Sequence, residues 1–214
     1  SAVGSVGPIT NIYIGLFSGL ASGAGVVISQ YFGANDNEKL SKTVHTSALI
    51  TIILSVVFTA VSLLLTPLML QLMLRTTEGE IYPAAQTYLL IYFSGTVFTL
   101  VYNMGAAILR AVGDSKRPFY YLAVAAVINT VLDLVFVFNF DMGVAGVAYA
   151  TIIAQAVSAI LTVITLLKTR LCVRVTPKLM KIDWPILKKI VIVGIPAALQ
   201  LALTAFSNVF VQSY

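Results

Sequence analysis

Two polar side chains lie four positions apart in the middle of an apolar stretch of this sequence. Asn129 and Asp133 belong to a hydrophobic run that extends from Phe119 to Phe138. Residues four apart share one face of a helix, so the amide and the carboxylate form one polar spot among Leu, Val and Phe side chains. An ionisable group in such a run is costly to bury and is interpreted first as functional. The pair is therefore the first candidate site of the chain.

The composition predicts an integral membrane protein. Only 10% of the residues are charged and 59% are hydrophobic, and the mean hydropathy is +0.97. A soluble domain of this length cannot bury so much apolar surface. The single cysteine, Cys172, and the single histidine, His45, supply neither an intrachain disulfide nor a Cys/His metal cluster. We interpret both residues as incidental.

Six apolar runs are long enough to cross about 30 Å of hydrocarbon as helices. These runs cover residues 9–32, 44–74, 83–109, 119–138, 142–167 and 187–211. They are continuous, unlike the short alternating segments of a β-barrel. The sequence thus predicts an all-α, multi-pass membrane helix bundle in which short loops join antiparallel neighbours.

The basic residues indicate the orientation of these helices. Every Lys and Arg except Arg75 lies in or beside the loops 33–43, 110–118 and 168–189, which alternate spans place on one side. An excess of Lys and Arg is typical of cytoplasmic loops, so we expect these loops in the cytoplasm of a cell-membrane protein. We therefore interpret the net charge of +5 as a sign of membrane orientation and not of a nucleic-acid-binding surface. The charged residues expected on the outer side are Arg75, Glu78, Glu80 and Asp141.

Small residues recur at four-residue spacing in two of the runs. Gly15, Gly19 and Gly23 form one stripe, and a second stripe runs from Gly146 through residues 150 and 154. Such stripes let helix backbones approach closely in a membrane, so both predict helix packing.

The segment 169–186 differs from the runs on either side of it. It mixes basic residues with apolar ones, too charged to span a membrane and too apolar for a free tail. We expect it to lie along the membrane surface with Trp184 at headgroup level. It would link the helices of residues 1–168 to a second group of helices, of which residues 187–214 form the first. Because the chain starts without Met and ends in an apolar run, we expect it to be part of a larger membrane protein.

Five motifs in order resemble the multidrug and toxic compound extrusion (MATE) family. The motifs cover residues 23–34, 110–118, 129–133, 143–155 and 194–200. The resemblance extends over essentially the whole chain. It implies a twelve-helix transporter with two six-helix lobes, of which this chain would hold helices two to six and the first helix of the second lobe.

The resemblance also implies a role for the opening pair. In one branch of the family, residues matching Asn129, Asp133 and Thr151 bind the coupling H⁺ or Na⁺, together with an Asp on a first helix that has no counterpart here. Asp133 and Thr151 are eight and ten residues from Asp141, which places them at similar depths of roughly 12 and 15 Å. Structural hydrogen bonding of Asp133 to a neighbouring helix is the alternative role.

Two further polar residues are expected near a substrate cleft. Asn103 falls there by resemblance, and Gln155 extends the polar face of Thr151 by one helical turn. Hydrogen bonding between helices is an equal alternative for both residues. Tyr82, Tyr88 and Tyr92 are interpreted as an interfacial belt.

The implied function is export of drugs or toxic organic cations, or of amphipathic molecules, by H⁺ or Na⁺ antiport with alternating access. No cofactor is expected apart from the coupling ion. The expected partners are the exported molecules, membrane lipids and the rest of the transporter, and no nucleic acid is expected. A related flippase of lipid-linked precursors is disfavoured because no Lys or Arg lies in the middle of a run. An intramembrane enzyme would need a second Asp, a Ser/His pair or a His/Glu cluster, so we expect no enzyme.

Overall fold

Each apolar run of the sequence forms helix in the computed structural model, which describes residues 2–74, 81–140 and 142–212. The described residues contain no strand, so the all-α prediction is confirmed. The helices are α1 (Ala2–Gly33), α2 (Asn37–Leu74), α3 (Ile81–Ser94), α4 (Thr96–Ala111), α5 (Lys116–Leu134), α6 (Gly143–Lys168) and α7 (Trp184–Gln212). A π-helical turn, η1 (Val135–Asn139), follows α5, and a 3₁₀ turn, η2 (Pro177–Leu179), lies in the linker. Arg75, Glu78, Glu80 and Asp141, expected on the outer side, lie outside the described residues.

The lengths and surfaces of the helices suit a membrane. Among the described residues, the spans 37–67, 116–139 and 143–168 are long and apolar enough to cross one, and the bent pair α3–α4 is a fourth if its two helices are counted as one span. Helices α1 and α7, of 32 and 29 residues, cover the remaining two predicted runs and exceed about 30 Å in length. Outward-facing side chains such as Leu64 and Val127 are apolar and 79% and 65% exposed, as contact with lipid requires.

The prediction of one continuous helix over residues 83–109 is wrong. The run divides at Gly95 into α3 and α4, which meet at an angle of 44°. The Gly95 N–H donates to the Tyr92 carbonyl at 3.1 Å, and the Gly95 carbonyl accepts from the Phe98 N–H at 3.0 Å, so tighter turns replace α-helical bonds. A Cβ atom on residue 95 would lie 2.9 Å from Ile152 Cδ1 of α6. The side chain of Ile152 thus occupies the space that the glycine leaves at the bend.

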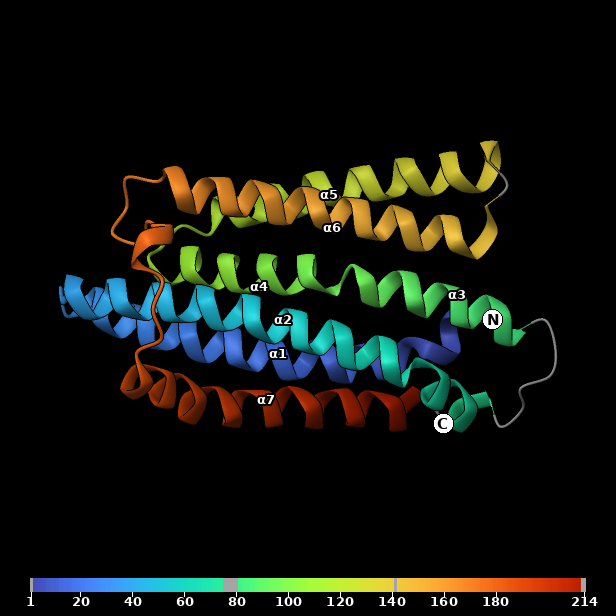
Figure 1. Ribbon diagram of the computed structural model, residues 1–214, viewed down its shortest axis with the longest axis horizontal. Coiled ribbons are helices and arrows are strands. Elements are labelled where there is room, and N and C mark those ends of the chain that lie inside the picture. The colour runs from blue at the N-terminus through green and yellow to red at the C-terminus, as the bar shows by residue number, and fades with distance from the viewer. Residues whose placement is uncertain (1, 75–80, 141, 213–214) are drawn as a thin grey trace.

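The helices run side by side along the bundle (Figure 1). Helices α5 and α6 pair at one edge, α4 packs between α6 and α1, and α7 packs against α1 at the opposite edge. The segments 34–36, 112–115 and 169–183 all lie at one end, which we name the linker end, whereas α1 begins and α7 ends at the other (Figure 1).

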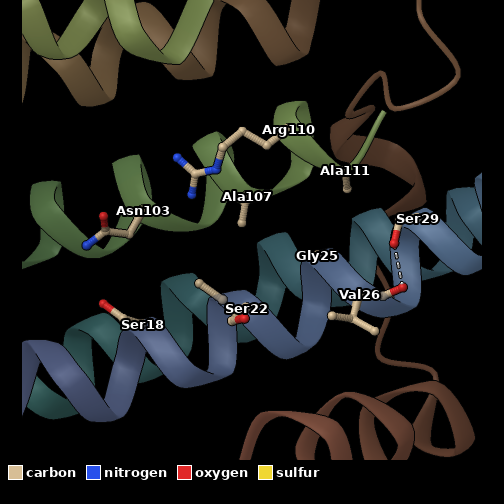
Figure 2. A pocket seen from close by; sticks show the side chains of 10 residues that line it. Ser18, Ser22, Gly25, Val26, Ser29, Asn103, Ala107, Arg110 and Ala111 are labelled. Atoms are coloured by element: carbon tan, nitrogen blue, oxygen red, sulfur yellow. Dashed lines mark hydrogen bonds between the residues drawn. The ribbon is translucent and has the colours of Figure 1, made fainter. Parts of the chain in front are cut away.

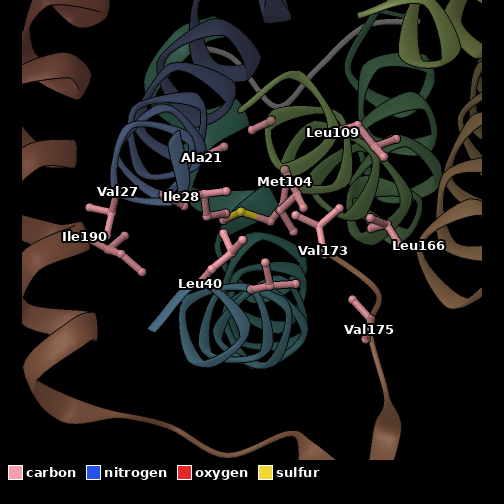
Figure 3. Packing of buried hydrophobic residues seen from close by; sticks show 14 of the residues in the cluster. Ala21, Val27, Ile28, Leu40, Met104, Leu109, Leu166, Val173, Val175 and Ile190 are labelled. Carbon is pink, nitrogen blue, oxygen red and sulfur yellow. The ribbon is translucent and has the colours of Figure 1, made fainter. Parts of the chain in front are cut away.

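The largest buried cluster lies near the linker end and joins five helices to the linker. Its side chains come from α1, α2, α4, α6 and α7, with Val173 and Val175 added from the linker (Figure 3). Val173 is fully buried, whereas Trp184 is 71% exposed. The part of the predicted surface segment around Val173 therefore inserts into the end of the bundle, whereas the part around Trp184 is exposed and can contact a membrane surface.

Small residues bring the backbones of α1 and α7 into contact. A Cβ atom on Gly23 would lie 2.6 Å from the Cα of Gly194, and one on Gly19 would collide with Ala198. The predicted packing role of this stripe is confirmed for these two glycines, whereas a Cβ atom on Gly15 would meet nothing within 4 Å. Helix α7 continues through Pro196 without a break.

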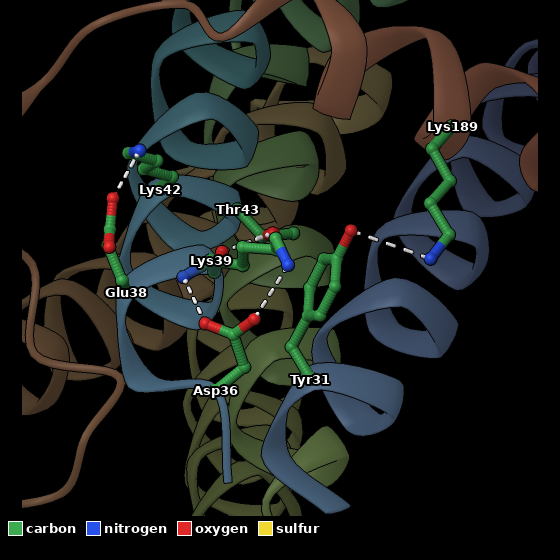
Figure 4. A network of polar contacts seen from close by, with 7 residues as sticks. All are labelled: Tyr31, Asp36, Glu38, Lys39, Lys42, Thr43 and Lys189. Carbon is green, nitrogen blue, oxygen red and sulfur yellow. Dashed lines mark hydrogen bonds and ion pairs between the residues drawn. The ribbon is translucent and has the colours of Figure 1, made fainter. Parts of the chain in front are cut away.

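Polar contacts join α1, α2 and α7 at the linker end (Figure 4). The Lys189 ammonium of α7 lies 4.6 Å from the centre of the Tyr31 ring of α1. Asp36 caps α2 by accepting the Lys39 N–H at 3.0 Å. The Lys39 side chain also hydrogen-bonds this carboxyl, which lowers the pKa of Asp36 below its usual value.

Candidate functional site

The predicted polar residues of α5 and α6 meet where the two helices pack together. Asn129 Nδ2 donates a long hydrogen bond of 3.5 Å to Thr151 Oγ1. The Thr151 hydroxyl donates in turn to the Val147 carbonyl one turn back, at 2.9 Å. The threonine oxygen thereby faces α5 at the level of Asn129, one helical turn from Asp133, the residue that the sequence predicted at a depth similar to that of Thr151.

Asp133 lies one turn beyond Asn129 on α5. Its side chain is half-buried, and its Oδ1 atom is buried without any hydrogen-bond partner among the described residues. No Lys or Arg of the described part of the chain forms an ion pair with it. A buried carboxylate oxygen without a donor is unfavourable unless a proton or a cation satisfies it.

The backbone changes form directly after this carboxylate. Helix α5 ends at Leu134, and the π-helical turn η1 continues the chain over Val135–Asn139. Gly146 of α6 packs here, since a Cβ atom on it would lie 2.9 Å from the Phe136 Cβ. Single π-helical turns are frequent at functional sites. The sequence contained no signal for this turn, because its hydrophobic pattern is that of an ordinary helix.

Tyr88, which the sequence predicted in an interfacial belt with Tyr82 and Tyr92, lies on α3. Its ring stacks on that of Tyr92, one turn further along the helix, with 5.8 Å between the ring centroids.

A cavity of about 390 Å³ is lined by residues of α1 and α4 (Figure 2). Asn103 and Arg110 line it from α4, and Ser18, Ser22 and Ser29 line it from α1. The Arg110 side chain, expected in a loop, extends along α4 toward Asn103 (Figure 2). The structure thus places Asn103 in the lining of this cavity.

Gln155 does not line this cavity. It lies half-buried on α6, where its backbone carbonyl accepts the Ser158 hydroxyl at 2.8 Å. The two residues predicted near one cleft are therefore not brought together. The prediction for Gln155 relied on its place one turn from Thr151, which does not determine the position of α6 relative to α1.

The donor atoms near Asp133 suit a proton or a hard cation. They are a carboxylate, an amide and a hydroxyl oxygen, whereas soft transition metals favour thiolate and imidazole ligands. No group of three or more His, Cys, Asp or Glu side chains suited to a metal occurs within 2–74, 81–140 and 142–212.

Comparison with known proteins connects this arrangement to a family. The MatE family model matches residues 1–135. The chain belongs to the MatE family. A curated relative of this MatE chain, the probable multidrug resistance protein YpnP of Bacillus subtilis, is 37% identical over 183 residues, which are 86% of this chain and 40% of the relative. The predicted MATE resemblance is confirmed.

Solved MATE structures share the fold. A multidrug resistance MATE family transporter of the MOP superfamily in its outward-facing conformation matches with a TM-score of 0.90 at 29% identity, over 99% of this chain and 47% of that one. The inward-facing conformation of such a transporter matches with a TM-score of 0.88 at 29% identity, over 96% and 46%. The MatE chain thus spans less than half the length of these proteins.

Proposed function

We propose that this MatE chain is the ion-coupling half of a secondary active exporter of cationic or amphipathic small molecules. In this proposal H⁺ or Na⁺ binds at Asp133, with Asn129 and Thr151 as further oxygen ligands. The family membership and the relative's description as a multidrug resistance protein support the class of function. Transport and not catalysis is also what the names of the matched MATE structures describe.

One observation carries the ion-coupling role: the buried Oδ1 of Asp133 has no partner in the described residues, beside a contact between Asn129 and Thr151. A structural hydrogen bond, the alternative role, would use a donor at this oxygen. A proton or a cation satisfies the oxygen instead, and its release leaves a negative charge in an apolar span. The occupied and empty states therefore differ in local charge, which is what a two-state helix arrangement needs to respond to an ion.

The similar fit to both transporter conformations supports alternating access. TM-scores of 0.90 and 0.88 to outward- and inward-facing structures are the values expected if these helices keep nearly the same arrangement in both states. Motion of a largely rigid half against the remainder of the transporter is the usual form of alternating access. Charge at Asp133 then biases the position of this half.

The cavity between α1 and α4 is the proposed part of the substrate path on this chain. Its volume of about 390 Å³ lies within the range of small-molecule sites. Asn103 and the α1 serines offer hydrogen-bonding groups in the lining, and Arg110 is its one charged side chain. Gln155 is not part of the proposed path.

The proposed orientation places the linker end in the cytoplasm of a cell-membrane protein. Loops 33–43, 110–118 and 168–189 adjoin this end (Figure 1). They contain nearly all of the Lys and Arg residues, and this distribution is the positive-inside pattern.

The test is gradient-driven export by the intact protein in sealed vesicles, with ethidium as the cationic probe. Asp133→Asn is expected to abolish uptake driven by a pH gradient or a Na⁺ gradient, whichever drives the unmodified protein, while leaving the thermal unfolding transition in place. Glu38→Gln is the matched control, because Glu38 lies in an exposed pair with Lys42 that contributes little. Undiminished export by Asp133→Asn would refute the coupling role.

A further inference from the structure

A second cavity, of about 460 Å³, lies at the linker end of α5 and α6. Arg117 reaches it from the first turn of α5, Lys168 from the last residue of α6, and Arg170 from the start of the linker. It shares no lining residue with the cavity around Asn103. The proposed transport mechanism uses none of these three side chains.

The lining of this cavity holds three cations and no acidic residue. Within the described residues, the side chains of Lys168 and Arg170 take part in no ion pair or hydrogen bond. The Arg117 side chain is paired through its Nε, which lies 3.4 Å from Asp114 Oδ2, and the Arg117 backbone N–H donates to Asp114 Oδ1 at 3.3 Å. Like charges around one cavity repel each other, and a bound anion offsets that repulsion. The unused donors therefore favour an anionic ligand.

Fixed contacts hold the walls in place. The Tyr121 hydroxyl of α5 and the Thr165 hydroxyl of α6 are hydrogen-bonded at 2.6 Å, which joins the two helices at the cavity. The Thr169 hydroxyl accepts the Leu171 N–H at 3.2 Å and shapes the turn that presents Arg170. The cations therefore project from a defined wall, although their own side chains extend into solvent.

The same cavity has an apolar edge. Ile164 of α6 and Leu171 of the linker line it and are 43% and 41% exposed. Both lie within about one helical turn of Lys168 in sequence, at the end of a span where headgroups meet hydrocarbon. Cationic donors next to exposed apolar side chains suit an amphiphile better than a soluble anion. Basic pockets between membrane helices are a recurrent form of lipid headgroup site.

We propose that Arg117, Lys168 and Arg170 bind the phosphate of an anionic phospholipid in the leaflet at the linker end, with its acyl chain against Ile164 and Leu171. The proposed membrane orientation is needed only to identify that leaflet as the cytoplasmic one. Bound lipid would join α5 and α6 to the linker, because the three cations come from these three segments.

Native mass spectrometry of the intact protein in detergent tests this site with three probes: phosphatidylglycerol, phosphatidylcholine and inorganic phosphate. The double variant Lys168→Gln, Arg170→Gln is compared with Lys178→Gln, Lys181→Gln, which removes two exposed linker cations that do not line the cavity. Phosphatidylglycerol affinity is expected to fall about fivefold for each cavity cation removed, hence about 25-fold for both. The linker control is expected to keep its affinity.

Three results would overturn the proposal. The first is an equal loss in both double variants, which would mean general surface charge. The second is equal binding of phosphatidylcholine and phosphatidylglycerol, and the third is cation-dependent binding of inorganic phosphate without lipid binding. Should the glutamine variant fail to fold, Lys168→Arg, Arg170→Lys keeps the charges and is expected to retain phosphatidylglycerol. These lipid measurements need no transport, so they succeed or fail independently of the coupling role of Asp133.

Discussion

His45 Nε2 of α2 accepts a hydrogen bond of 3.0 Å from the backbone N–H of Thr176 in the linker, across 131 positions of sequence. The other ring nitrogen, Nδ1, lies 2.7 Å from the Ser41 carbonyl and donates to it, which fixes the neutral tautomer that leaves Nε2 as an acceptor. The imidazole is only 3% exposed. The prediction that His45 is incidental is therefore wrong.

Thr46, the next residue, makes a second attachment to the same linker. Its hydroxyl accepts the Asp183 N–H at 3.1 Å and donates to the Lys181 carbonyl at 3.3 Å. Two consecutive side chains of α2 thus hold the segment that leads into α7. These bonds therefore join the linker, which leads into α7, to α2.

Replacing His45 by Ala is expected to loosen the linker. The Thr176 N–H loses its acceptor, and an unsatisfied buried donor costs about 1–3 kcal/mol. Hydrogen exchange followed by mass spectrometry should show faster exchange in a peptide covering Thr176, with little change in peptides from α5. Ser41→Ala is the control, because it removes the Ser41 hydroxyl, 3.4 Å from Nδ1, and keeps the backbone carbonyl at 2.7 Å that orients the imidazole. Unchanged protection at Thr176 in His45→Ala would contradict the attachment.

Replacing Gly23 by Ala is expected to separate α1 from α7. The added Cβ would lie 2.6 Å from the Gly194 Cα, and overpacking of this kind costs about 1–3 kcal/mol. Thermal unfolding of the intact protein in detergent should therefore begin at a lower temperature. Gly15→Ala is the matched control, since its Cβ would meet nothing within 4 Å on the same helix. Equal stability of the two variants would mean that the close contact is not needed.

Replacing Gly95 by Ala is expected to disturb the bend between α3 and α4, because the new Cβ would meet Ile152. A loss of about 1–3 kcal/mol in unfolding free energy is expected from overpacking. Combining it with Ile152→Ala tests the cause, since residues in contact are energetically coupled. The loss in unfolding free energy of the double variant should be smaller than the sum of the losses in the two single variants. Strict additivity would show that Ile152 does not determine the space at the bend.

Local patterns explain what the sequence predicted correctly and what it did not. The apolar runs and the spacing of Asn129 and Asp133 are properties of single helices, so composition and helical period were sufficient to find them. The contact between His45 and Thr176 joins a helix to an irregular segment, and its existence depends on how the linker folds back. The bend at Gly95 likewise depends on a side chain from α6. Tertiary packing, which one sequence does not reveal, determines both features.

The contact between Asn129 and Thr151 yields the sharpest prediction about the ion site. If both side chains serve one bound ion, Thr151→Ser keeps the hydroxyl and is expected to retain gradient-driven ethidium export, whereas Thr151→Val removes the oxygen and is expected to weaken it. Asn129→Ala is expected to weaken export similarly. The loss of export in the double variant Asn129→Ala, Thr151→Val should be smaller than the two single losses combined, because residues in contact show interaction energies of about 0.5–3 kcal/mol. Transport rates measured over a range of pH and Na⁺ concentration provide the comparison. If Thr151→Val and Asn129→Ala transport normally while Asp133→Asn does not, the carboxylate alone carries the coupling ion, and the hydrogen bond of 3.5 Å only packs α5 against α6.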